Sequence, residues 1–154
     1  MAKNIHKNKL KGFSLFELLI TMGILMLLSL IVFPVATQKA QESKLESYAS
    51  QLVTDIYYQQ QRSAHRAVPE GISLSANGYT LFDGETLLDA TETDIKDYPN
   101  NIRITSVSIT NGDDIFFPAG EFKPFSYGSL VITDGLHSIR VSINKEGLIV
   151  YEKL

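Results

Sequence analysis

The sequence predicts an α+β fold, in which one long helix precedes a set of antiparallel strands. From Val35 to Val68 there is no Gly or Pro, and apolar residues recur at intervals of three and four, the period of a helix. From Ile72 onward the apolar period changes to two, which is typical of strands. Asn77-Gly78 lies between two such segments and indicates a hairpin with a type I′ turn.

The N-terminal part of the predicted helix is long and apolar enough to cross a membrane. No charged residue occurs from Leu18 to Gln38, and a helix needs roughly 20 apolar residues to span the hydrocarbon core. A single apolar span must be helical there, because its backbone has to satisfy its own hydrogen bonds. Glu17 stands at the start of this run, where a carboxylate is unfavourable and indicates a function.

A short basic segment precedes the apolar run. Residues 1–12 contain four lysines and no acid, and they end in Gly12. Because basic residues stay on the cytoplasmic side, we expect this leader to be cytoplasmic and the C-terminal part of the chain to lie outside. The four lysines are Lys3, Lys7, Lys9 and Lys11.

The leader and the start of the apolar run resemble the type IV prepilin signal. The elements that match are the basic leader, Gly12, Phe13 and a Glu four residues later, at Glu17. The resemblance implies that prepilin peptidase cleaves between Gly12 and Phe13 and methylates the new amine of Phe13. It further implies that Glu17 pairs with such an amine during assembly, and that Pro34 kinks the helix.

Three other interpretations of the N-terminus are open to the sequence. An ordinary signal peptide has a shorter apolar core and a small-x-small cleavage site, which this segment lacks. A simple uncleaved anchor explains the length of the run but explains neither Gly12 nor Glu17. A buried core helix does not need an uncharged run of this length.

Three regions follow from these patterns: the leader (residues 1–12), a transmembrane and assembly helix (residues 13–38) and an exterior domain (residues 39–154). In the domain, residues 39–67 form an amphipathic helix that Pro69 and Gly71 end. Sheets follow over residues 72–152, and the apolar phase slips between Ile104 and Val107, which predicts a β-bulge. The predicted strands cover residues 72–76, 79–82, 102–110, 115–117, 128–133, 138–143 and 148–151.

Composition argues against several classes of function. Four of the 14 basic residues lie in the leader and one of the 17 acids is Glu17, so residues 39–154 carry 10 basic and 16 acidic residues. This acidic balance disfavours a general polyanion-binding surface. The chain has no Cys, which excludes disulfides and thiolate chemistry, and its three His have no metal-ligand spacing. We therefore expect neither an enzyme nor a cofactor.

Two further stretches are interpreted as structural. Acidic residues crowd Asp83–Asp97, and we expect a solvated loop with a short helical turn near 90–97 rather than a calcium site. An aromatic group is expected to form core and lid rather than a ligand cleft. Its members are Phe116, Phe117, Phe122, Phe125 and Tyr127.

The order of the C-terminal strands is similar to that of the GspH/FimT class of minor pseudopilins, which carries two small sheets packed on the helix. The resemblance implies a structural subunit of a type IV pilus or of a type II secretion-type pseudopilus. The partners it implies are prepilin peptidase, other subunits, an inner-membrane assembly platform and membrane lipid. Two alternatives stay open: a DNA-uptake pilus subunit that contacts DNA, and a membrane-anchored exterior domain with another binding role. The position of Leu148, where that class often has Arg, weakens the case for DNA.

Overall fold

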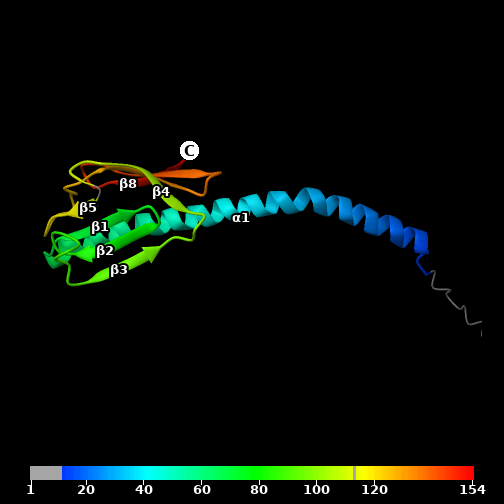
Figure 1. Ribbon diagram of the computed structural model, residues 1–154, viewed down its shortest axis with the longest axis horizontal. Helices are drawn as coiled ribbons and strands as arrows, with labels where there is room; N and C mark the ends of the chain where they lie inside the picture. Colours follow the sequence, from blue (N-terminus) through cyan, green and yellow to red (C-terminus); the bar gives the residue numbers. More distant parts are fainter. Residues whose placement is uncertain (1–11, 113) are drawn as a thin grey trace, which may run out of the picture. The chain divides into compact units, whose positions relative to one another are not determined.

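The computed structural model describes residues 12–112 and 114–154, without the side chains of Ile31, Val32 and Pro34. The predicted leader therefore lies outside the described residues, except for Gly12. The described chain consists of one helix followed by eight strands (Figure 1). It separates into two compact units, one ending at Lys39 and the other covering Ala40–Leu154.

Helix α1 (Leu15–Arg66) is continuous over 52 residues. It ends where Ala67 takes up a left-handed backbone conformation (φ 54°), just before Pro69. A residue in this conformation is a common way to terminate a helix. The predicted uninterrupted helix is confirmed.

The eight strands form two antiparallel sheets of four strands each. The first sheet has the order β3-β2-β1-β5 and consists of β1 (Glu70–Ser75), β2 (Gly78–Asp83), β3 (Thr93–Asp97) and β5 (Asp114–Phe117). The second sheet has the order β4-β6-β7-β8 and consists of β4 (Arg103–Ile109), β6 (Gly128–Thr133), β7 (Ser138–Ile143) and β8 (Ile149–Lys153). The α+β prediction, with a type IV pilin-like arrangement of one long helix and small antiparallel sheets, is confirmed.

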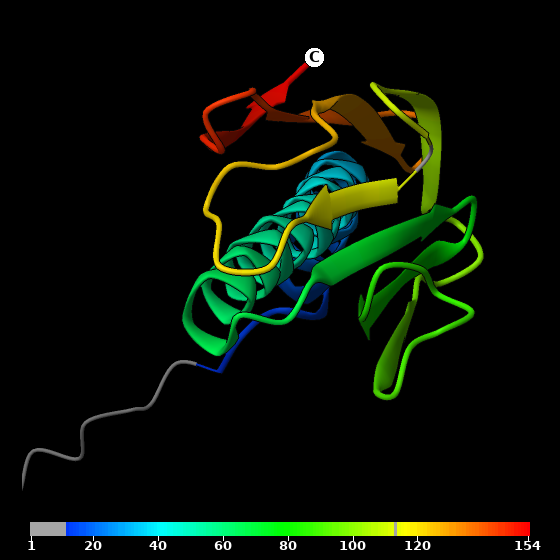
Figure 2. The same ribbon diagram turned by 90° about the vertical axis from the view of Figure 1, so that its left-hand side faces the viewer.

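Within the C-terminal unit, the sheets lie on different sides of the last part of α1 (Figure 2). The helix contributes a stripe of four fully buried residues to the core: Leu45, Ala49, Leu52 and Ile56. They are spaced by four, three and four residues, so they share one face of the helix. Both sheets supply partners to the same hydrophobic cluster, among them Ile72 and Phe117 from the first sheet and Leu130 and Ile132 from the second.

The buried stripe continues with polar residues toward the end of α1. Gln59 donates to the carbonyls of Gly71 (2.9 Å) and Phe82 (3.1 Å) in the first sheet. Gln60 donates to the carbonyls of Phe122 (2.8 Å) and Gly147 (3.0 Å), in loops that border the second sheet. These two side chains therefore attach the helix to loop and strand backbone where the apolar stripe has ended.

The predicted β-bulge is present in β4. The register against β6 shifts between Thr105 and Ser108, and Ser106 has a positive φ of 50°. The extra residue brings Ile109, which packs against the core, to the same face of the strand as the buried Ile104, whereas Val107 within the bulge is exposed. The slip in the apolar phase between Ile104 and Val107 had this cause.

The first hairpin differs from the prediction. Ser75 pairs with Gly78, so the turn consists of Ala76 and Asn77, and neither residue has the positive φ that a type I′ turn requires. Gly78 is instead the first residue of β2, where a Cβ would collide with the backbone carbonyl of Lys96 in β3. The glycine serves the close approach of two strands rather than the turn.

The acidic stretch also differs from the prediction. Residues 93–97 form strand β3 at the outer edge of the first sheet, not a helical turn. Most of its side chains are exposed, including Ile95, and Lys96 forms an ion pair with Asp94 (2.7 Å). Charged residues are common on edge strands, because they discourage pairing with a further chain.

Candidate assembly segment at the N-terminus

Ser14 caps the start of α1. Its Oγ accepts a hydrogen bond from the Phe16 N–H (3.2 Å), and its carbonyl accepts the first helical bond from the Leu18 N–H (3.1 Å). Ser is among the preferred residues at this position, because its side chain satisfies a backbone donor that the helix leaves free. The cap, Ser14, directly follows Phe13, and α1 begins at the next residue, Leu15.

Glu17 lies in the first turn of this helix. A carboxylate there interacts favourably with the partial positive charge of the helix N-terminus. Ser14 and Glu17 have the spacing of a capping box, so the start of the helix can be predicted from the sequence. Within residues 12–112 and 114–154, the Glu17 carboxylate has no hydrogen-bond or ion-pair partner, so it is available to a group outside the described chain.

Gly12 and Phe13 precede the helix, and both are exposed, Phe13 to 81%. A Cβ on Gly12 would have no atom within 4 Å. The packing of the described chain therefore gives no reason for glycine at this position. The peptide bond between the two residues is open to an enzyme.

The helix surface that follows is apolar and uncovered. Every described side chain from residue 13 to residue 41 is exposed, and the segment is long and apolar enough to cross a membrane. Two of its hydroxyl groups are satisfied within the helix, since Thr21 donates to the Leu18 carbonyl (2.9 Å) and Ser29 to the Leu25 carbonyl (2.8 Å). Internal satisfaction of this kind is what an apolar environment demands.

Small residues interrupt this apolar surface. A Cβ on Gly23 would meet nothing within 4 Å, so the helix itself does not require glycine there. Ser29 lies among bulky apolar side chains of the same helix that are more than half exposed, including Met26, Leu30 and Phe33. Small residues on an apolar helix permit the close approach of another helix.

Comparison with known families gives one match. The model of the prokaryotic N-terminal methylation motif matches residues 7–33. The N-terminal segment of this protein is type IV prepilin-like. No curated protein and no solved structure gives a significant match.

The matched motif of the prepilin-like chain contains three of the four predicted site residues: Gly12, Phe13 and Glu17. The structure brings these three together at the start of α1. The fourth, Pro34, belongs to α1 but its side chain lies outside the description, so the kink stays a prediction. Lys3, Lys7, Lys9 and Lys11 of the predicted leader also lie outside the described residues.

The motif is typical of precursors that prepilin peptidase processes and that assemble with other pilin subunits. This class is structural rather than enzymatic. The apolar N-terminal helix is consistent with a single-pass membrane anchor. The motif covers the N-terminal segment of the chain.

Proposed function

We propose that this protein is a minor structural subunit of a type IV pilus or of a type II secretion-type pseudopilus, in the GspH/FimT-like class. Its basic leader stays in the cytoplasm, its apolar helix spans the inner membrane, and its C-terminal unit lies outside. Prepilin peptidase cleaves between Gly12 and Phe13 and methylates the Phe13 amine. An inner-membrane platform then transfers the subunit from lipid into the filament.

One observation carries this proposal: the Glu17 carboxylate, which has no partner in the described chain, lies at the start of an apolar helix segment that no other part of the described chain covers. The first sheet and the second sheet cover the helix stripe from Leu45 to Ile56, whereas nothing in the described chain covers residues 13–41. In the membrane, lipid covers this surface, and in a filament the helices of other subunits do. The presence of two small sheets also supports the GspH/FimT-like assignment.

Cleavage gives Glu17 its partner. While Gly12 is attached, Phe13 N is part of a peptide bond and carries no charge. After cleavage it becomes a cation, which the Glu17 carboxylate of a neighbouring subunit neutralises. In an apolar bundle an unpaired charge is strongly unfavourable, so the pairing fixes the axial position of each new subunit.

The experiment compares the wild type with Glu17→Ala and Ser14→Ala in cells that assemble the filament. Filaments are sheared from the cells and probed for this protein, and the membrane fraction reports on insertion and cleavage. We expect Glu17→Ala to be inserted and cleaved normally but to be strongly depleted from the sheared fraction. Pro34→Ala, in the same helix, tests the proposed kink by the same two fractions.

Ser14→Ala is the matched control for helix capping. It removes the capping hydroxyl, which contributes about 1 kcal/mol to a helix start, but keeps the carboxylate. If Glu17 acts by pairing, Ser14→Ala enters filaments at close to the wild-type level. Equal incorporation of Glu17→Ala and wild type contradicts the pairing, and an equal loss in both variants assigns Glu17 to the helix start instead.

The sequence does not favour the DNA-uptake alternative. Residues 39–154 carry six more acids than bases, and phosphate contacts require clustered Lys and Arg. The alternative of an anchored exterior domain predicts a different result for Glu17→Ala. A plain membrane anchor tolerates the loss of this carboxylate, whereas a filament subunit does not.

A further inference from the structure

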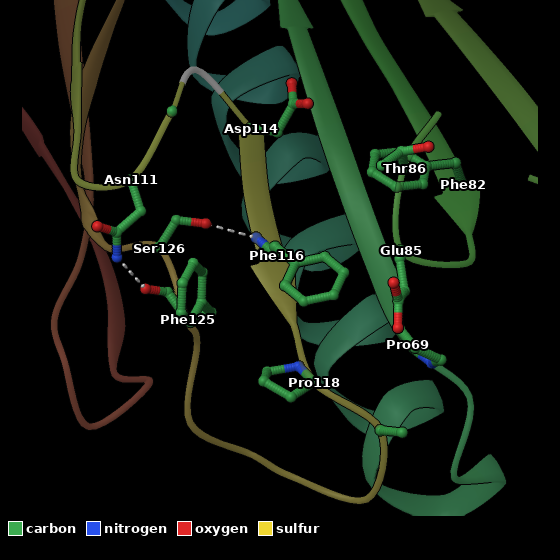
Figure 3. A pocket seen from close by; sticks show the side chains of 12 residues that line it. Pro69, Phe82, Glu85, Thr86, Asn111, Asp114, Phe116, Pro118, Phe125 and Ser126 are labelled. Atoms are coloured by element: carbon green, nitrogen blue, oxygen red, sulfur yellow. Dashed lines mark hydrogen bonds between the residues drawn. The ribbon is translucent and has the colours of Figure 1, made fainter. Parts of the chain in front are cut away.

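The outer face of the first sheet carries a hollow of about 490 Å³ (Figure 3). Its floor comes from strands β2 and β5, and its walls come from the loop after β2 and the loops on either side of β5. Ligand pockets commonly have a volume of this order. This hollow lies within the C-terminal unit and does not involve the N-terminal segment.

Strand register creates the floor. Phe82, Gly71 and Phe116 form one cross-strand row over β2, β1 and β5. A Cβ on Gly71 would collide with the Phe82 ring, so the missing side chain lets this ring lie flat across β1. Phe82 is thereby buried, while Phe116 next to it stays partly accessible. Phe117, the neighbour of Phe116 in the sequence, points to the opposite side and is fully buried in the core.

Phe116 and Phe125 form an aromatic corner. Their ring centroids are 6.3 Å apart and their planes are nearly perpendicular (87°). Phe125 is 58% exposed, although its backbone is fixed by a hydrogen bond from its N–H to the Phe116 carbonyl (2.8 Å). An exposed aromatic ring on a fixed backbone presents its face to a ligand without further ordering of the chain. Phe125, which was expected to belong to the core or a lid, therefore forms a wall of the hollow.

The charged residues that line the hollow are both acids, Asp114 and Glu85. Asp114 lies two residues before Phe116 on β5, so the two side chains share the outer face of the sheet. Glu85 enters from the opposite wall (Figure 3). In the described part of the chain, neither carboxylate has a hydrogen bond or an ion pair. Many other acidic side chains of this domain do have a partner, for example Glu92, which forms an ion pair with Arg62 (3.0 Å).

Both walls are held in place. On the Glu85 side, the Gly84 N–H donates to the Pro69 carbonyl (2.8 Å), and the Asp83 carboxylate accepts from the Glu92 N–H (2.7 Å). The hydrogen bonds that the Asp83 carboxylate accepts from Glu92 and Thr91 lower its pKa, and the bond from the Glu92 N–H contributes most. On the other side, the Asn111 amide donates to the Phe125 carbonyl (3.0 Å; dashed in Figure 3).

We infer that this hollow binds an arginine side chain that a partner protein presents beside an apolar residue. A guanidinium is planar, stacks on an aromatic face and carries donors at its edge for carboxylates. In the hollow, the Phe116–Phe125 corner can stack on the guanidinium plane, and two unpaired carboxylates can accept hydrogen bonds from its N–H groups. The described lining contains no basic residue that would neutralise these carboxylates. The remaining apolar floor accommodates the residue next to the arginine.

The partner inserts side chains rather than adding a strand. The outer edge of β5 is already occupied at Phe116, whose N–H donates to Ser126 Oγ (2.9 Å) and whose carbonyl accepts from Phe125. A peptide therefore cannot extend the sheet at this point, as it does when binding is by strand addition. Recognition has to come from side-chain chemistry in the hollow.

The test uses the full chain in detergent micelles, with ¹³C-labelled phenylalanine observed by NMR. Two probes are titrated: the dipeptide amide acetyl-Leu-Arg-NH₂ and its neutral counterpart acetyl-Leu-citrulline-NH₂. We expect the arginine probe to shift the Phe116 and Phe125 ring signals and to bind more tightly. One exposed ion pair contributes up to about 1 kcal/mol, so we expect the citrulline probe to bind about fivefold more weakly.

Two matched variants assign the effect to the hollow. Asp114→Asn and Asp97→Asn remove one charge each from opposite edge strands of the same sheet. We expect Asp114→Asn to weaken binding of the arginine probe by about fivefold and Asp97→Asn to leave it unchanged. Phe125→Leu, at an exposed position that leaves the core intact, is expected to weaken binding as well.

Several outcomes overturn the inference. They are equal binding of the two probes, an equal effect of Asp97→Asn and Asp114→Asn, or shifts confined to phenylalanines outside the hollow. Tighter binding of the uncharged probe acetyl-Leu-Phe-NH₂ than of the arginine probe also overturns it, because the hollow is then an apolar site. Because all readouts come from the C-terminal unit, they do not depend on whether the protein enters a filament.

Discussion

The Tyr79 hydroxyl donates a hydrogen bond of 2.6 Å to Asp55 Oδ2 and so joins strand β2 of the first sheet to helix α1. Burial raises the pKa of Tyr79 far above its usual range, and the bond to Asp55 adds to this effect. The hydroxyl therefore remains a donor throughout the accessible pH range. A second buried tyrosine packs edge to face against Tyr79: Tyr98, at a centroid distance of 5.8 Å.

The two tyrosines give a matched pair of variants. The Tyr98 hydroxyl is buried and has no partner among the described residues, in contrast to that of Tyr79. We expect Tyr79→Phe to lower the free energy of unfolding by about 1–3 kcal/mol, because Asp55 loses its donor. Tyr98→Phe removes an unsatisfied group and should leave stability unchanged or increase it. Thermal unfolding of both variants beside the wild type measures the difference, and equal losses would show that the hydrogen bond to Asp55 does not matter.

The helix stripe under the sheets predicts a second stability effect. Leu52 is fully buried and its neighbour Gln51 is exposed. We expect Leu52→Asp to destabilise the C-terminal unit by about 3 kcal/mol or more, because it buries an unpaired charge. Gln51→Asp places the same residue on the outer face and should have little effect. Near-UV circular dichroism during denaturation reports on both, and a Leu52→Asp variant that unfolds with the wild type would refute the packing of α1 on the sheets.

Glu70 predicts a pH effect with an unusual sign. Its side chain is almost fully buried, and burial raises its pKa above the ordinary value of 4.5 even though Arg62 attracts the carboxylate. Arg62 Nε is 3.0 Å from Glu70 Oε1, but neither atom has a hydrogen bond, so the pair is close without being well directed. Because the folded pKa is raised, the contribution of Glu70 to stability is largest below pH 4.5 and is lost as the pH rises through the folded pKa.

The comparison is wild type against Glu70→Gln in chemical denaturation at pH 4 and pH 7. We expect the free energy of unfolding of the wild type minus that of Glu70→Gln to be larger at pH 4 than at pH 7. Arg62 keeps its contact with Glu92 in the variant, so its charge does not become isolated. A difference that stays constant between the two pH values, or that grows in favour of the wild type toward pH 7, contradicts the raised pKa.

How far the sequence predicted the fold depends on whether a signal was local. The helix stripe, the β-bulge near Ser106 and the order of the last strands were visible, because each shows in the spacing of apolar residues. Strand β3 was missed, because an exposed edge strand has charged residues in place of an apolar alternation. The role of Gly78 was missed, because it depends on a third strand that approaches its backbone.

The same distinction holds for the sites. Gly12, Phe13 and Glu17 could be predicted because they form one short motif, and the capping role of Ser14 could have been predicted from its spacing to Glu17. The buried role of Gln59 and Gln60 could not, because polar residues on a helix are usually on its solvent face. The hollow could not either, since Phe82 and Phe116 meet only through the register of three strands.

The measurement that tests the central claim most directly is the intact mass of the protein extracted from membranes of cells that contain prepilin peptidase, with fragmentation of its N-terminus. We predict a chain that begins at Phe13 and carries one methyl group on its α-amine. As a control, Gly12→Val, which places a branched side chain at the cleavage site, should leave the chain uncut, whereas Gly12→Ala should have a mild effect. A wild-type chain that begins at Met1 or at Lys39 contradicts the account.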